Sequence, residues 1–111
     1  MIKVEKIIKA TNIDKNLIPY KIKDNKFFKT YGILYFLGEY EIEINIKELN
    51  KNNFELTIEK RFKNVPKEYS HLMFVNTTVE YKRFSYIASF DKAIKVLKDN
   101  LWYAKLKKLS K

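Results

Sequence analysis

Residues 40–46 alternate apolar and polar side chains and follow a mostly apolar run, 31–37, across a central Gly38-Glu39 pair, which is the pattern of a β-hairpin. Glycine at the first of two loop positions suits a type II′ turn, because that position needs a positive φ angle. Folding the segment there keeps one face of both strands apolar. The predicted pairs on that face are Leu37 with Tyr40, Tyr35 with Ile42, Ile33 with Ile44 and Tyr31 with Ile46, while the opposite, mixed face pairs Phe36 with Glu41 and Leu34 with Glu43.

The alternation resumes in residues 54–62 after an asparagine-rich turn at 50–53, which predicts a second hairpin. Setting Ile46 opposite Ile58 aligns the apolar positions and leaves a three-residue loop. Asn53 then takes the left-handed position of that loop, a conformation that asparagine tolerates better than most residues.

Three glutamates, Glu39, Glu41 and Glu43, share one face of the strand between the two turns. The expected register sets Arg61 opposite Glu43 and Lys63 opposite Glu41. Oppositely charged cross-strand neighbours stabilise each other. The pattern therefore favours a solvated, ion-paired face over a carboxylate metal cluster.

The end of the chain has helical spacing. Ser89 can cap a helix whose first turn contains Asp91. One apolar stripe of this helix consists of Phe90, Ala93, Ile94, Leu97, Leu101 and Ala104. A second apolar side, formed by Trp102, Leu106 and Leu109, needs a partner of its own: the N-terminal segment, a dimer mate or a ligand.

The remaining segments carry weaker patterns. Residues 78–88 fit a strand with a bulge near Lys82-Arg83, where the apolar parity changes. Residues 66–77 fit a short helix or the beginning of a longer strand. In residues 1–30 the apolar spacing suits a helix and a strand equally, and we expect a peripheral strand plus loops there.

Together these elements predict an α+β fold in a single domain, residues 1–111, with an antiparallel meander of about four strands and a C-terminal helix packed on one face. Eight tyrosines and eight phenylalanines among 111 residues suffice for one core. The order of elements resembles the topology of Whirly-type single-stranded-DNA binders and related transcription cofactors. That resemblance covers the element order alone.

The formal net charge is +10, and residues 1–30, 31–59 and 60–111 carry +5, −4 and +9 respectively. Such a division favours a polyanion as the ligand. Only Arg61 and Arg83 among the 23 basic residues are arginines. Lysine is a point charge suited to phosphates, whereas arginine forms the paired hydrogen bonds that read guanine, so we expect backbone binding with little sequence specificity.

Basic and aromatic residues interleave in three clusters, at 26–29, 60–63 and 81–86. In single-strand binding, lysines follow the phosphates while exposed rings stack on bases, each stack contributing about 1–3 kcal/mol. The same clusters also fit core rings beside a charged edge strand, and the basic tail fits cations at a helix C-terminus. The candidate nucleic-acid contacts are Lys60, Arg61, Lys63, Tyr81, Lys82, Arg83, Phe84, Tyr86, Lys105, Lys107 and Lys108.

The chain has no cysteine, one histidine (His71) and two glycines. This composition excludes a disulfide scaffold and a Cys nucleophile, and it leaves no Ser-His set or phosphate-cradling glycine loop. We therefore expect no enzymatic activity, no cofactor and no metal site. The chain has neither a signal-like start nor a run of about eighteen apolar residues, which favours a cytoplasmic protein without a membrane partner.

Two function classes fit these observations. The first is a small non-enzymatic protein that binds the phosphate backbone of single-stranded or structured DNA or RNA. The second is a protein-binding inhibitor or adaptor from a phage or mobile element, of the anti-defence or anti-CRISPR type, acting on a complex that handles nucleic acid. Its anchor would be Trp102, Leu106 and Leu109, because exposed tryptophan is a typical hot-spot residue. A third alternative is a structural or homodimeric protein whose charge serves only solubility.

Overall fold

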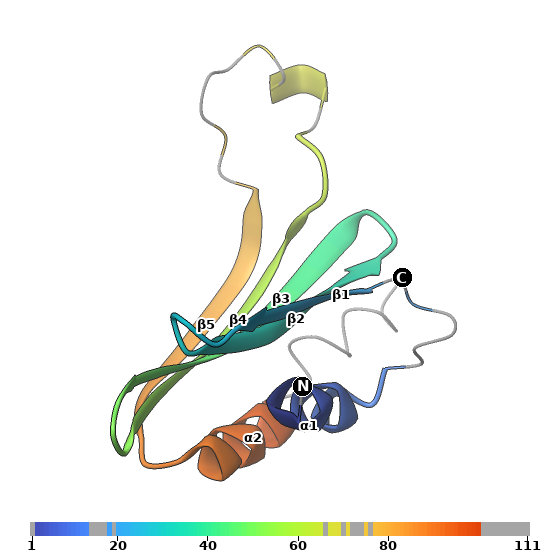
Figure 1. The fold of residues 1–111 in the computed structure, drawn as a ribbon. Coiled ribbons are helices and arrows are strands. Elements are labelled where there is room, and N and C mark those ends of the chain that lie inside the picture. Colours follow the sequence, from blue (N-terminus) through green and yellow to red (C-terminus); the bar gives the residue numbers. More distant parts are fainter. Residues whose placement is uncertain are drawn as a thin grey trace.

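The computed structural model describes residues 2–13, 18, 20–65, 67–69, 71, 75 and 77–100. Their elements are α1 (Ile2–Thr11), β1 (Tyr20–Asn25), β2 (Thr30–Leu37), β3 (Tyr40–Asn50), β4 (Asn53–Phe62), the 3₁₀ turn η1 (Lys67–Tyr69), β5 (Thr78–Ile87) and α2 (Phe90–Asp99). The five strands form one antiparallel sheet in the order β1-β2-β3-β4-β5, and both helices pack on one side of it (Figure 1). The expected α+β class and the helix on the sheet are confirmed, with five strands instead of about four.

The β2–β3 hairpin has the register that the alternation predicts. Leu37 lies opposite Tyr40, and the pairing continues without a shift to Tyr31 opposite Ile46. Gly38 has a φ angle of 59°, so it occupies the turn position that requires glycine. The apolar face of this hairpin is the centre of the core, where Ile33 and Ile44 are fully buried.

The β3–β4 register differs from the expected one by two residues. Ile46 lies opposite Leu56, not Ile58, and Asn52, not Asn53, takes the left-handed conformation with φ 65°. A slip of two residues leaves every side chain on its original face. The apolar pattern therefore cannot distinguish the two registers, and the tight turn decides between them.

Strand β5 matches the expected segment, but its bulge lies further along. The pairing shifts between Phe84 opposite Leu56 and Ile87 opposite Phe54, so the extra residue falls at 85–86 and not at Lys82-Arg83. A second shift follows near Thr78, at the other end of the strand. The apolar parity changes because Tyr81, opposite Glu59, lies on the face away from the core and stays in solvent, whereas Phe84, opposite Leu56, lies on the core face.

The N-terminal segment corrects the expectation of a strand plus loops. Residues Ile2–Thr11 form helix α1, which buries Val4, Ile7 and Ile8. Their spacing of three and four residues places them on one helical face, which packs on β2 and α2. The expected peripheral strand is present as β1, which pairs with β2.

Helix α2 begins as predicted. Ser89 Oγ accepts a hydrogen bond from the Lys92 backbone N–H at 3.1 Å, which satisfies one of the free amides of the first turn. The buried residues of the described helix are the first four of the predicted stripe: Phe90, Ala93, Ile94 and Leu97. Leu101 and Ala104 lie outside the described residues.

Candidate functional site

The sheet has one face covered by the two described helices and one face that neither of them covers (Figure 1). We call the second the open face. Side chains alternate between the two faces along each strand. Glu41 and Glu43 of β3 and the residues that pair with them on β4 therefore lie on the open face. Its charged members are Lys21 and Lys23 of β1, Glu41, Glu43 and Lys47 of β3, Glu55, Glu59 and Arg61 of β4, and Arg83 of β5.

Arg61 is the centre of an ion-pair network on this face. Its guanidinium lies 2.6 Å from Glu41 Oε1, 2.8 Å from Glu43 Oε1 and 3.1 Å from Glu59 Oε1. Burial alone would lower the pKa of Arg61, but hydrogen bonds to Glu41 and Glu43 and the charges of these two carboxylates outweigh it and raise the pKa. Arg61 therefore neutralises the acidic strand and is not placed to receive a phosphate.

Glu43 is the most strongly held of these carboxylates. Burial alone would raise its pKa, but hydrogen bonds from Asn45, Lys23 and Arg61 outweigh burial and lower the pKa to about 2. The predicted ion-paired face is thus confirmed for Glu41 and Glu43. The expected pairing of Glu41 with Lys63 is wrong, because the two-residue register difference gives Arg61 to Glu41, while the Lys63 backbone N–H donates to the Glu39 carbonyl at 3.0 Å.

Lys60 lies on the opposite, helix-covered face. Only 7% of the residue is exposed, and its Nζ lies 4.0 Å from the centre of the Tyr40 ring. Consecutive strand residues point to opposite faces, so Lys60 and Arg61 cannot form one surface. Of the basic cluster 60–63, only Lys63 has an exposed side chain.

Strand β5 forms one of the two edges of the described sheet. Most of the candidate nucleic-acid contacts on this strand are exposed to solvent. Tyr81 is 53% exposed and Tyr86 is 87% exposed, and Lys82 and Arg83 are exposed as well. Arg83 Nε lies 3.0 Å from Glu55 Oε2. Phe84 differs from these residues because it is partly buried and packs against the core.

Tyr86 has an unusual backbone. It occupies the β5 bulge with a φ angle of 59°, the left-handed region that glycine normally supplies at such a position. We define the exposed β5 residues Tyr81, Lys82, Arg83 and Tyr86 as the β5 edge. Tyr81 and Arg83 lie opposite Glu59 and Thr57 on the open face, whereas Lys82 lies opposite Ile58 on the other side of this edge strand.

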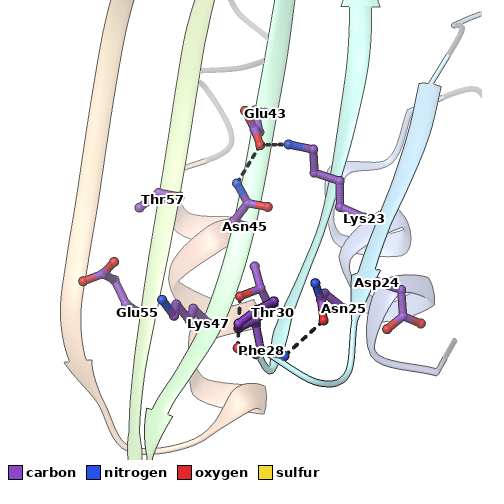
Figure 2. Close-up of a pocket in the computed structure, with 10 residues that line it drawn as sticks. All are labelled: Lys23, Asp24, Asn25, Phe28, Thr30, Glu43, Asn45, Lys47, Glu55 and Thr57. Carbon is purple, nitrogen blue, oxygen red and sulfur yellow. Dashed lines mark hydrogen bonds and ion pairs between the residues drawn. The ribbon is translucent and has the colours of Figure 1, made fainter.

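The open face also contains a pocket of about 690 Å³ beside the β1–β2 turn (Figure 2). Strands β1 to β4 and the turn all contribute to its lining. The lining residues are Lys23, Asp24, Asn25, Phe28, Thr30, Glu43, Asn45, Lys47, Glu55 and Thr57.

Gly32 shapes the sheet next to this pocket. A Cβ atom at Gly32 would collide with the Ile44 carbonyl oxygen and with Asn45 Oδ1. Glycine therefore lets the Asn45 amide lie flat against β2, where its Nδ2 donates to Glu43 Oε2 at 3.0 Å. The sequence clusters gave a partial signal for this pocket, since Phe28 belongs to the basic and aromatic run 26–29, but they did not indicate the cross-strand contact of Gly32.

The basic tail and the second apolar side of the C-terminal helix lie outside the described residues. This applies to the candidate nucleic-acid contacts Lys105, Lys107 and Lys108 and to the candidate protein contacts Trp102, Leu106 and Leu109. In the described part of the chain, no group of three acidic or histidine side chains could hold a metal ion. No helix of that part is long and apolar enough to cross a membrane.

Comparisons with protein-family models, curated proteins and solved structures gave no match. The likeness in element order to Whirly-type proteins stays a prediction from the sequence.

Proposed function

We propose that this protein binds the phosphate backbone of nucleic acid without enzymatic activity and with little sequence specificity, and that the β5 edge is the main contact. The observation that carries the proposal is the strained, solvent-exposed Tyr86. The formal net charge of +10 supplies the long-range attraction for a polyanion.

The backbone conformation of Tyr86 costs free energy, and the packing of its side chain does not offset this cost. A left-handed backbone costs an L-residue about 1–2 kcal/mol relative to glycine. With 87% of the residue in solvent, the ring gains little from burial in the free protein. Residues with a strained backbone are common at binding sites, where contacts with a ligand stabilise the strained conformation. A stacked base is a suitable ligand for an exposed tyrosine ring.

Arg83 places positive charge on the same face as Tyr81, and Lys82 adds positive charge from the other side of the edge strand. Arg83 is paired with Glu55, but 59% of its side chain is exposed, and pairs of that kind contribute little because water screens them. Arg83 can therefore exchange part of this contact for a phosphate at small cost. Lys63, whose side chain is exposed beyond the end of β4, adds a further cation.

The first test measures how salt affects binding of a fluorescent single-stranded oligonucleotide, followed by anisotropy. We expect the Lys82→Gln/Arg83→Gln double variant to lower the salt slope by roughly 1.4, since each phosphate contact contributes about 0.7 for a single strand. The matched control is Lys92→Gln/Lys95→Gln, which removes the same charge from exposed positions on α2. Equal effects of the two double variants would show that binding is not localised at the β5 edge, and wild-type protein without salt-dependent binding would contradict the function itself.

Tyr86→Gly separates binding from folding. Glycine adopts the left-handed conformation readily, so we expect the free energy of unfolding to stay equal or rise by up to about 1 kcal/mol. Loss of the stacking ring should weaken binding by about tenfold or more. A variant that is less stable but binds as tightly as the wild type would mean that Tyr86 has a structural role.

A further inference from the structure

The pocket on the open face and the β5 edge are neighbours. Arg83, at the edge, contacts Glu55, which lines the pocket. The β5 bulge also lies opposite Glu55, because Phe54 pairs with Ile87 and Leu56 pairs with Phe84. A polymer held along the β5 edge therefore passes the rim of the pocket.

An aromatic ring forms one wall of the pocket. Phe28 is 62% exposed, and its ring meets the Phe27 ring edge-on with 5.0 Å between centroids. The turn that carries it is held by local hydrogen bonds: Asn25 Oδ1 accepts from the Phe28 N–H at 3.0 Å, and Thr30 Oγ1 donates to the Phe28 carbonyl at 3.2 Å. An exposed ring on an ordered turn loses little conformational freedom when a flat ligand stacks on it.

The polar lining of the pocket offers both a donor and an acceptor. Lys47 lies directly opposite Glu55 in the β3–β4 register, and Figure 2 shows the two side chains next to each other. The Lys47 side chain makes no hydrogen bond or ion pair to another described residue. Glu55 binds Arg83 through Oε2, which leaves Oε1 as an acceptor. The Lys47 ammonium can donate to an acceptor atom of a ligand, and Glu55 Oε1 can accept from a neighbouring donor atom. The pair therefore complements a ligand edge that has an acceptor next to a donor.

Negative charge disfavours a phosphate inside this pocket. Glu43, Glu55 and Asp24 all line it. The Glu43 carboxylate is already occupied by Lys23, Asn45 and Arg61, as Figure 2 shows in part. A neutral, flat ligand with hydrogen-bonding edges fits better than an anion.

We propose that this pocket receives an unpaired nucleobase, which stacks on Phe28 and bonds Lys47 and Glu55 through its pairing edge. The proposal rests on the nucleic-acid binding proposed above, and it makes the ligand single-stranded. In a duplex the pairing edges are already bonded and the bases are stacked, so a duplex offers the pocket nothing to bind. The phosphates stay outside, along the β5 edge.

Binding measurements with three variants test this assignment. The probes are a short single-stranded oligonucleotide of mixed sequence and the duplex of the same sequence. Phe28→Ala removes the stacking wall, and Lys47→Met removes the ammonium group but keeps a side chain of similar length. The matched control is Phe27→Ala, because Phe27 is more exposed, at 86%, and does not line the pocket.

We expect Phe28→Ala to weaken single-strand binding by about tenfold and Lys47→Met by about fivefold, while Phe27→Ala stays within about twofold of the wild type. Duplex binding, which is weaker from the start, should change by less than about twofold in all three variants. Thermal unfolding should be nearly unaltered, since the removed groups are exposed.

Two outcomes overturn the base pocket. One is equal single-strand binding by the wild type, Phe28→Ala and Lys47→Met; the other is an equal loss in Phe28→Ala and Phe27→Ala. If Lys82→Gln/Arg83→Gln still weakens binding in that experiment, the proposed function survives and only the pocket assignment fails. If the wild type binds no nucleic acid, the function fails first.

Discussion

The two faces of the sheet use the same strands but different interactions. On the helix-covered face the central residues Ile33, Ile44 and Leu56 are fully buried, and the residues that pair with them across the strands are apolar. On the open face the centre is Arg61 with its glutamates, and the edges carry exposed lysines and rings. The comparison indicates that one face supplies most of the folding free energy, while the other balances its charges and leaves lysines and rings exposed at its edges.

The largest expected effect is a difference in the free energy of unfolding when one side chain is truncated on each face. Ile44→Ala leaves a cavity in the core and should lower the free energy of unfolding by about 2–5 kcal/mol. Thr57→Ala, on the open face of the neighbouring strand, should cost less than about 1 kcal/mol. Urea denaturation measures both values. Similar losses would mean that the open face is packed as tightly as the core.

The second expected effect separates the centre of the open face from its edge. Arg61→Met leaves three partly buried carboxylates without their shared cation and should destabilise the fold by about 1–3 kcal/mol. Arg83→Met removes an exposed arginine with one carboxylate partner, and its cost should stay below about 0.5 kcal/mol.

The control for these two arginine variants is to measure their free energies of unfolding as a function of pH. Arg61 helps to keep Glu43 ionised down to about pH 2, so the penalty of Arg61→Met should shrink as the pH falls from about 5 to about 2 and this carboxylate becomes protonated. Equal penalties for the two arginine variants, or a penalty that does not depend on pH, would contradict the structural role of Arg61.

The smallest of these effects concerns the charge of Glu43. Its pKa falls from an ordinary value of 4.5 to about 2 in the folded chain. A lowered pKa in the folded state contributes stability that is complete above the unfolded value and is lost as the pH falls from about 5 to about 2. The expected loss is about 1–2 kcal/mol, because water still reaches the carboxylate and weakens its interactions.

Urea denaturation of the wild type and of Glu43→Gln over this pH range measures that contribution. The free-energy difference between the two proteins should narrow as the pH falls toward about 2, because Glu43 of the wild type then becomes protonated in the folded state as well as in the unfolded state. A constant difference across the range would show that the charge of Glu43 does not contribute.

How much of this molecule follows from its sequence depends on the element. The β2–β3 register is predictable because Gly38 fixes the turn, whereas the β3–β4 register is not, because a two-residue slip keeps every apolar side chain on its face. Helix α1 is too short for its apolar spacing to exclude a strand, and only its packing on β2 and α2 decides the matter.

The candidate site was predictable in composition more than in arrangement. The run 60–63 looks like one basic cluster, but strand alternation buries Lys60 and gives Arg61 to the glutamates. The exposed rings of the β5 edge were among the predicted contacts. The pocket was not predicted, because it depends on contacts between strands that are distant in sequence, such as that of Gly32 with Asn45.

The most direct measurement is a map of backbone amide shifts in ¹⁵N-labelled protein during titration with an unlabelled single-stranded oligonucleotide. We expect the largest shifts at Tyr81–Tyr86 and in the turn at 26–29, with smaller ones at Lys47 and Glu55. The exposed lysines of α1 and α2 should shift little, although they carry the same charge. Shifts confined to the helices, or no shift at low salt, would contradict the assignment of the open face and its edge as the binding surface.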